Sequence, residues 1–166
     1  MVKVRELFAV MIVFTGSLFA CKEKPVQQTL PSLTEEDQIR ATIYSYQIGE
    51  HGRAWPAIFL GLNDSNGILG INSDPSEELL YTLKISYPNA RRYSQAHFGA
   101  KCIYEIDSTQ CGIILLLCPL QRITSSQVQV VGTHQINSRA AGGILFFLHK
   151  EAQSWIVDSS RIAWLS

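Results

Sequence analysis

Residues 142–158 read GGILFFLHKEAQSWIVD, and this stretch decides the fold class. Gly143–Lys150 and Trp155–Trp164 are rich in β-branched and aromatic residues, and the polar turn Glu151–Ser154 separates them. Two such runs joined by a short polar segment are typical of a β-hairpin. We therefore predict two antiparallel strands, the second bent around Ser159-Ser160.

The strand pattern extends upstream of this hairpin. Turn residues recur at Ser125-Ser126 and Ser138–Gly142, and the runs between them are β-branched, aromatic or alternating. Consecutive strands with short connections favour an antiparallel meander. In chain order, the predicted strands are Tyr93–Phe98, Cys102–Ile106, Gly112–Ile123, Gln127–Ile136, Gly143–Lys150 and Trp155–Trp164.

A helix is predicted at the start of the folded region. Thr34 supplies an N-cap hydroxyl, and acidic residues 35–37 follow it in the first turn. Ile39, Ile43 and Tyr46 then recur at steps of four and three, which indicates one apolar face. We expect this helix to end near Gly49.

A second helix is predicted after a short buried strand at Ala57–Leu62. Asp74 can cap it, Pro75 suits the first helical position, and Glu77 completes a capping-box pattern. Leu79, Leu80 and Leu83 form its inward face, and it ends before Pro88.

These elements predict an α+β fold in which the helices come first and the sheet comes last. The closing pattern, Gly142–Leu148, a polar turn and then Ser154–Asp158, resembles the last hairpin of cystatin-like folds in the nuclear transport factor 2-like superfamily. The resemblance implies that N-terminal helices pack on a curved antiparallel sheet. Residues 34–166 are expected to form one such domain.

The first twenty residues have the pattern of a bacterial secretory leader. Lys3 and Arg5 precede an apolar core of about thirteen residues, Leu7–Phe19, whereas a membrane-spanning helix needs roughly twenty. Leu18-Phe19-Ala20-Cys21 resembles the lipobox of bacterial lipoproteins. The resemblance implies cleavage before Cys21 and attachment of a diacylglyceryl group to its thiol, with an ordinary cleaved leader as the alternative.

The segment 21–33 is predicted to be a lipidated tether. It contains Pro25, Pro31, two glutamines and few large apolar residues, and twelve residues would extend roughly 40 Å at most. Lys22 follows the cysteine, where lipoproteins retained at the inner membrane of diderm bacteria carry aspartate. The resemblance therefore implies a cell-envelope location, at the outer membrane if the host is diderm.

The charge balance argues against a nucleic-acid partner. Cleavage before Cys21 leaves 146 residues with 12 basic and 13 acidic side chains, since Lys3, Arg5 and Glu6 are lost. Nucleic-acid-binding proteins carry a basic excess on one face, and the sequence has no basic cluster beyond Arg91-Arg92.

Three cysteines remain in the folded region, Cys102, Cys111 and Cys118. Cys102 and Cys111 flank a turn-like segment, so they could form a disulfide at the base of a hairpin, while Cys118 is expected to be a small core residue. Zinc is the alternative for three cysteines, but no C-x-x-C pair and no histidine at ligand spacing occurs. We expect no metal and no cofactor.

His134 and Asp158 are the candidate catalytic residues. Alternation in Gln127–Ile136 places His134 on one face with Val128, Val130 and Gly132, so it is either an acid–base group or a structural histidine. Asp158 would share a face with Ile156, either as half of an acid–base dyad with His134 or as an outward carboxylate near Arg161.

These features lead to three functional hypotheses. The leading one is a noncatalytic domain, held at the membrane lipid through Cys21, that binds an envelope protein or a small-molecule ligand. The second is a small-pocket enzyme of the isomerase or hydratase kind that uses His134 and Asp158. The third is a structural subunit of an envelope assembly.

Overall fold

The computed structural model describes residues 32–65, 70–99, 101–105, 108 and 110–165. The predicted leader, the lipobox with Cys21 and nearly all of the tether lie outside these residues. The described part forms an α+β fold with two α-helices and a mixed, mostly antiparallel sheet of ten strands. The prediction of the α+β class is therefore confirmed.

Helix α1 spans Glu35–Gln47 and continues into a π-helical turn, η1, at Ile48–Gly52. The Thr34 hydroxyl accepts a hydrogen bond from the Asp37 amide at 3.1 Å, as predicted for the N-cap. Ile39 and Ile43 are buried, but Tyr46 is 39% exposed. The apolar pattern did not predict the burial of Tyr44, which is fully buried and donates a hydrogen bond from its hydroxyl to the Gly61 carbonyl at 2.5 Å.

Helix α2 spans Glu77–Ser86, and its N-cap is Ser76 rather than the predicted Asp74. The Ser76 hydroxyl accepts a hydrogen bond from the Leu79 amide at 3.2 Å. The Asp74 carboxylate accepts hydrogen bonds from the Ser94 amide at 2.8 Å and the Ser94 hydroxyl at 2.7 Å. Asp74 is thus engaged with the segment that follows the helix. The apolar face predicted for this helix is buried.

The sheet runs in the order β10-β9-β8-β6-β1-β2, with shorter strands attached to it. A 3-10 turn, η2, covers Tyr93–Gln95 between β3 and β4. The strands are β1 Ala57–Asn63, β2 Asn72–Ser73, β3 Ala90–Arg92, β4 Ala96–Phe98, β5 Ile103–Glu105, β6 Cys111–Leu117, β7 Gln121–Thr124, β8 Gln127–Gln135, β9 Ala141–Glu151 and β10 Ser154–Leu165.

Two of the predicted strands are divided. The predicted strand Gly112–Ile123 is two strands, β6 and β7, and both pair with β8. Pro119 lies between them, and proline has no amide hydrogen to donate to a ladder. The predicted strand Tyr93–Phe98 begins with η2, so that only its last three residues form β4.

The prediction that the helices come first and the sheet comes last is wrong for strand β1. It precedes α2 and lies inside the sheet, where it pairs in parallel with β6 and with β3. Ile58 and Leu60 belong to the main core, while Ala57 and Phe59 pack on the opposite face with Ile103, Ile114 and Leu116. Burial on both faces explains why this strand is a continuous apolar run.

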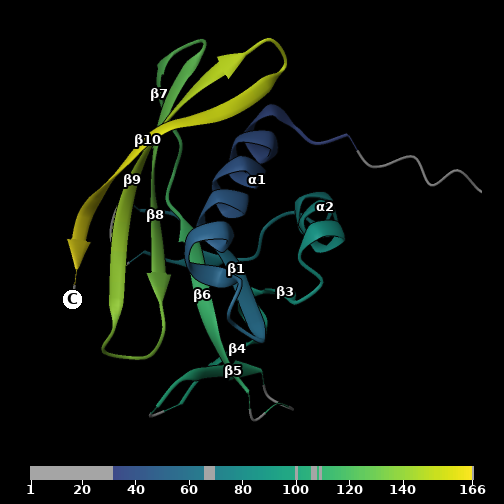
Figure 1. Cartoon of the computed structure of the whole chain (residues 1–166), viewed down its shortest axis with the longest axis vertical. Coiled ribbons are helices and arrows are strands. Elements are labelled where there is room, and N and C mark those ends of the chain that lie inside the picture. The colour runs from purple at the N-terminus through teal and green to yellow at the C-terminus, as the bar shows by residue number, and fades with distance from the viewer. Residues whose placement is uncertain (1–31, 66–69, 100, 106–107, 109, 166) are drawn as a thin grey trace, which may run out of the picture.

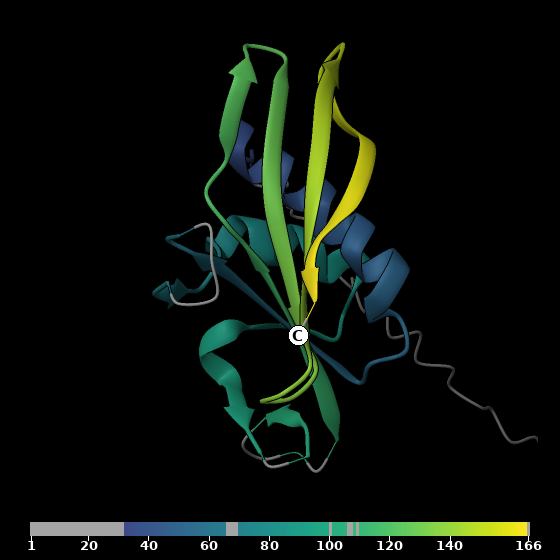
Figure 2. The ribbon, with the colours of Figure 1, turned by 90° about the vertical axis from the view of Figure 1, so that its left-hand side faces the viewer.

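Both helices lie on one side of the long strands (Figures 1 and 2). Helix α1 crosses the face of the sheet that carries the fully buried Val128, Phe146 and Leu148. Figure 2 shows the opposite face of β8, β9 and β10, which neither helix covers. The antiparallel pairing predicted for these three strands is confirmed.

The start of α1 is held to the sheet by ion pairs. The Glu35 carboxylate lies 2.7 Å from the Lys150 ammonium on β9 and 2.8 Å from the Arg122 guanidinium on β7. The hydrogen bonds from Lys150 and then Arg122 lower the pKa of Glu35. Asp37 links the two helices, because its carboxylate accepts hydrogen bonds from Arg40 at 3.0 Å and from the Ser76 hydroxyl at 2.9 Å.

Candidate functional site

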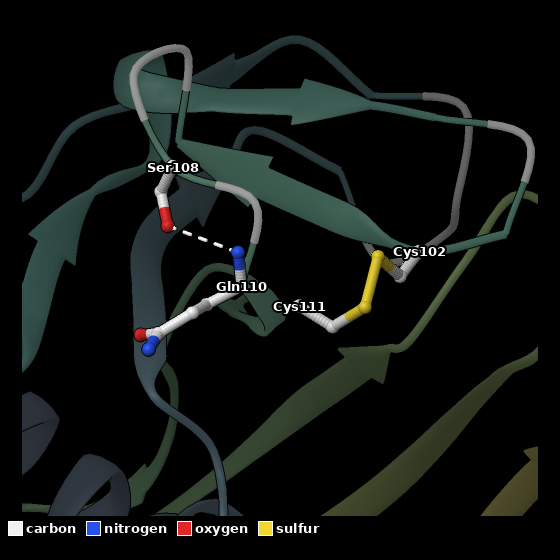
Figure 3. Close-up of a disulfide and its surroundings, with 4 residues drawn as sticks. All are labelled: Cys102, Ser108, Gln110 and Cys111. Carbon is white, nitrogen blue, oxygen red and sulfur yellow. Dashed lines mark hydrogen bonds between the residues drawn. A yellow bond between two sulfur atoms is a disulfide. The ribbon is translucent and has the colours of Figure 1, made fainter.

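Cys102 and Cys111 form a disulfide, with their Cα atoms 5.5 Å apart (Figure 3). The bond connects the start of β5 with the start of β6, at the end of the molecule farthest from the β7–β8 and β9–β10 turns (Figure 1). Beside it, the Gln110 amide donates a hydrogen bond to the Ser108 hydroxyl at 3.1 Å. This is the pairing that the cysteine spacing suggested.

Cys118 is the remaining cysteine of the described part of the chain, and it is free and buried. Burial raises the pKa of its thiol, which disfavours the nucleophilic thiolate. It lies at the end of β6, where its amide donates a hydrogen bond to the Val131 carbonyl at 2.9 Å. Its surroundings are those of a core residue.

His134 lies on β8 and faces the helical side of the sheet. Its ring stacks on that of His51 from η1, with centroids 5.2 Å apart and planes 26° apart. Burial and then the neighbouring His51 lower the pKa of His134. Its Nδ1 atom is buried and has no hydrogen-bond partner among the described residues. The histidine therefore lies between the helical turn and the sheet, in surroundings that disfavour its protonated form.

Gln47 is a buried polar side chain that the sequence analysis missed. It is fully buried, and neither its amide oxygen nor its amide nitrogen has a hydrogen-bond partner in the described part of the chain. A Cβ atom at Gly132 would lie 2.8 Å from the Gln47 amide nitrogen and 2.7 Å from the Phe146 ring, so a larger residue there would force one of these side chains to shift. The spacing of the residues could have indicated its burial. Gln47 and His51 continue the steps of four that begin with Ile39 and Ile43, so they lie on the same face of the helix.

Asp158 is exposed on β10, where its carboxylate pairs with the His149 ring of β9. His149 and Ile156 are partners in the strand register, so Asp158 and Ile156 share a face, as the alternation predicted. That face is opposite to the core, because the neighbouring Leu148 is buried in the core. Asp158 is thus an outward carboxylate.

The structure does not bring His134 and Asp158 together. His134 pairs across the sheet with Gly142, whereas Asp158 lies between the partners of Leu148 and Phe147. Five residues of β9 or more separate these levels, which is roughly 17 Å or more along a strand. The two side chains also lie on opposite faces of the sheet. The proposed dyad is therefore not formed.

Three of the surface cavities among the described residues are of note, and neither His134 nor Asp158 lines these three. One of about 500 Å³ lies between η1 and the end of α2 and includes Arg53 and Tyr87. A second, of about 420 Å³, lies beside the start of α1 and includes Trp155. The smallest, about 210 Å³, is lined by Arg40, Leu62, Asn63, Asp64, Ser73, Leu117, Cys118 and Pro119.

The outer strand β10 carries the most prominent exposed apolar side chains of the sheet. Ile162 is 68% exposed and Leu165 is 70% exposed, while Ile156 is 39% exposed. β10 ends the strand order, so in the described structure only β9 pairs with it. An exposed strand edge with apolar side chains is a surface on which another chain can add a strand.

Comparison with protein-family models, curated proteins and solved structures gives no match. Across the described ranges, no group of three or more histidine, cysteine, aspartate or glutamate side chains is arranged to hold a metal ion. Neither described helix has the length and apolar character needed to cross a membrane.

Proposed function

We propose that this chain is a lipid-anchored, noncatalytic binding domain of a bacterial cell envelope. The anchor is assigned to Cys21, on the resemblance of Leu18-Phe19-Ala20-Cys21 to a lipobox. In this proposal residues 21–33 form a tether between the anchor and the domain, whose first helix α1 begins at Glu35. Each buried methylene of an acyl chain contributes about 0.8 kcal/mol, so two or more chains would hold the domain at the membrane.

The binding role rests on one observation, the exposed apolar edge of β10. Large exposed apolar side chains that are grouped mark interaction surfaces more often than isolated ones do. Ile162 and Leu165 lie three residues apart on a strand whose second edge no described strand covers. The partner in this proposal is a protein of the envelope, bound by strand addition.

The proposal includes a cystatin-like fold. Helix α1 packs along one face of the sheet formed by β8, β9 and β10, which is the arrangement implied by the resemblance of the closing hairpin (Figure 1). The strand β1, which runs parallel to β6 inside the sheet, is an addition to that scheme.

Mass spectrometry of the mature protein tests the anchor. We expect an N-terminal Cys21 that carries diacylglycerol, and a C21S variant that leaves the membrane fraction. The matched control is C118S, which removes the buried free cysteine and keeps Cys21. An unmodified N-terminus, or a C21S variant that stays in the membrane, would contradict the anchor.

Site-specific photocross-linking in intact cells tests the binding surface. A photoreactive residue at Ile162 is expected to form a protein adduct, whereas the same residue at Ile85 of α2 is not. Ile85 is a matched control because it is also a strongly exposed isoleucine, at 59%. Equal yields at the two positions, or no adduct at Ile162, would contradict a binding role for β10.

A further inference from the structure

We infer that β10 pairs in antiparallel fashion with β10 of a second copy of this chain, about a two-fold axis beside Ser159-Ser160. The inference rests on the proposed binding role and names its partner. The result is one continuous sheet that runs through two molecules. The argument uses the position of β10, its charged centre and the apolar segments on either side of that centre.

The position of β10 makes pairing sterically accessible. It is twelve residues long and lies at one end of the sheet, whereas β2 at the other end of the order has two residues. Both helices pack on the core face (Figure 2). At the start of β10 the Thr42 hydroxyl of α1 lies 3.5 Å from the Trp155 carbonyl, so the part of the edge offered to a second chain is the stretch after Trp155. A long open edge is a template for another strand.

Asp158 and Arg161 lie on the same face of β10. The Asp158 carboxylate pairs with His149, and the Arg161 guanidinium lies 5.4 Å from the centre of the Phe147 ring. Phe147 and His149 are two residues apart on β9, so they share a face. Regular alternation would separate residues 158 and 161, but the register shifts between Val157 and Ser159.

This arrangement is self-complementary in charge. In a two-fold antiparallel pair, the segment before the axis lies beside the partner's segment after it. Each Asp158 is therefore placed near the partner's Arg161, on a common face, with small serines between them. Unlike charges on neighbouring strands stabilise pairing, and like charges weaken it. The two-fold symmetry forms the Asp158–Arg161 contact twice.

The apolar segments match in the same orientation. Trp155-Ile156-Val157 precedes the charged centre and Ile162-Ala163-Trp164 follows it. Antiparallel pairing places each of these triplets beside the other triplet of the second copy. Ile156 and Ile162, which are exposed in the single chain, would become cross-strand neighbours of apolar side chains. The centre thus supplies specificity, and the flanks supply apolar contact.

Charge exchange tests this pairing in the full-length protein purified from membranes in detergent. Sedimentation equilibrium should show a dimer for the unaltered chain. D158R and R161D should each dimerise roughly tenfold more weakly or worse, because each places like charges at both contacts. An equal mixture of the two variants should recover the dimer, because every contact then joins arginine to aspartate. The double variant D158R/R161D should dimerise as well.

Two controls keep the test independent of folding. Circular dichroism and thermal melting should show that each variant is folded, since D158R also removes the contact with His149. K84E reverses an exposed charge on α2 and should leave dimerisation unchanged. A monomeric unaltered chain, single variants that dimerise normally, or a mixture that fails to recover the dimer would overturn self-pairing. If Ile162 still cross-linked to a different protein, the binding role would stand without it.

Discussion

Replacement of Gln47 by methionine is expected to raise the free energy of unfolding. The Gln47 side chain is fully buried, and its amide oxygen and nitrogen have no hydrogen-bond partner among the described residues. Burial of an amide without a partner costs about 1–3 kcal/mol in protein mutational data. Methionine is unbranched and adaptable, so it fits beside Gly132 while removing that cost. We expect Q47M to be about 1–3 kcal/mol more stable.

Urea unfolding of the whole chain measures this change. For a protein of this size the slope is roughly 1–3 kcal/mol per molar urea, so the midpoint should rise by about 1 M. The matched control is Q38M, because Gln38 is an exposed glutamine of the same helix whose amide donates to the Leu33 carbonyl. Q38M should change stability by about 0.5 kcal/mol or less. A Q47M variant less stable than the unaltered chain would refute the reasoning and show that the amide is paired.

Three further changes have defined outcomes. F146A should lower the free energy of unfolding by about 3–5 kcal/mol in the same urea assay, because Phe146 is fully buried in the core. Replacement of Cys102 and Cys111 by serine should cost about 2–3 kcal/mol, and reduction of the unaltered chain should cost as much. The lowered pKa of His134 means that the unfolded chain binds its proton more readily. The contribution of His134 to the free energy of unfolding is therefore complete above a pH of about 6.5. It decreases as the pH falls from there through the pKa of His134 in the folded chain. Melting temperatures at pH 7.5 and 5 should show a smaller acid-induced loss in H134F; an undiminished loss would show that other groups cause it.

Elements defined by local patterns were predictable. The cap at Thr34, the apolar face of α2 and the hairpin of β9 and β10 each depend on residues that are close in sequence. The errors lie where two local signals compete. Asp74 and Ser76 are both good caps, and the choice of Ser76 depends on Ser94, which lies far along the chain but binds Asp74.

The surface of β10 that carries Asp158 and Arg161 was only partly predictable from the sequence. Alternation placed Asp158 on the same face as Ile156, and the structure agrees; the structure then decided that this face points outward. Alternation cannot place Arg161 on the same face, because that depends on a register shift within the sheet. The burial of Gln47 was missed for a similar reason. The sequence alone does not show whether a polar side chain in an apolar stripe is buried, or whether it has a hydrogen-bond partner there.

The amino-acid sequence by itself determined the α+β class, the apolar face of α2 and the long strands of the closing hairpin. These follow from periodicity, caps and turns, which act over a few residues. Only the tertiary structure decided that β1 lies parallel to β6 inside the sheet, that His134 meets His51 instead of Asp158, and that β10 pairs with β9 alone among the described strands. An apolar run is compatible with many neighbours, and its partner is chosen by the packing of the whole core. That is why the sequence predicted the elements, and the fold determined which side chains meet.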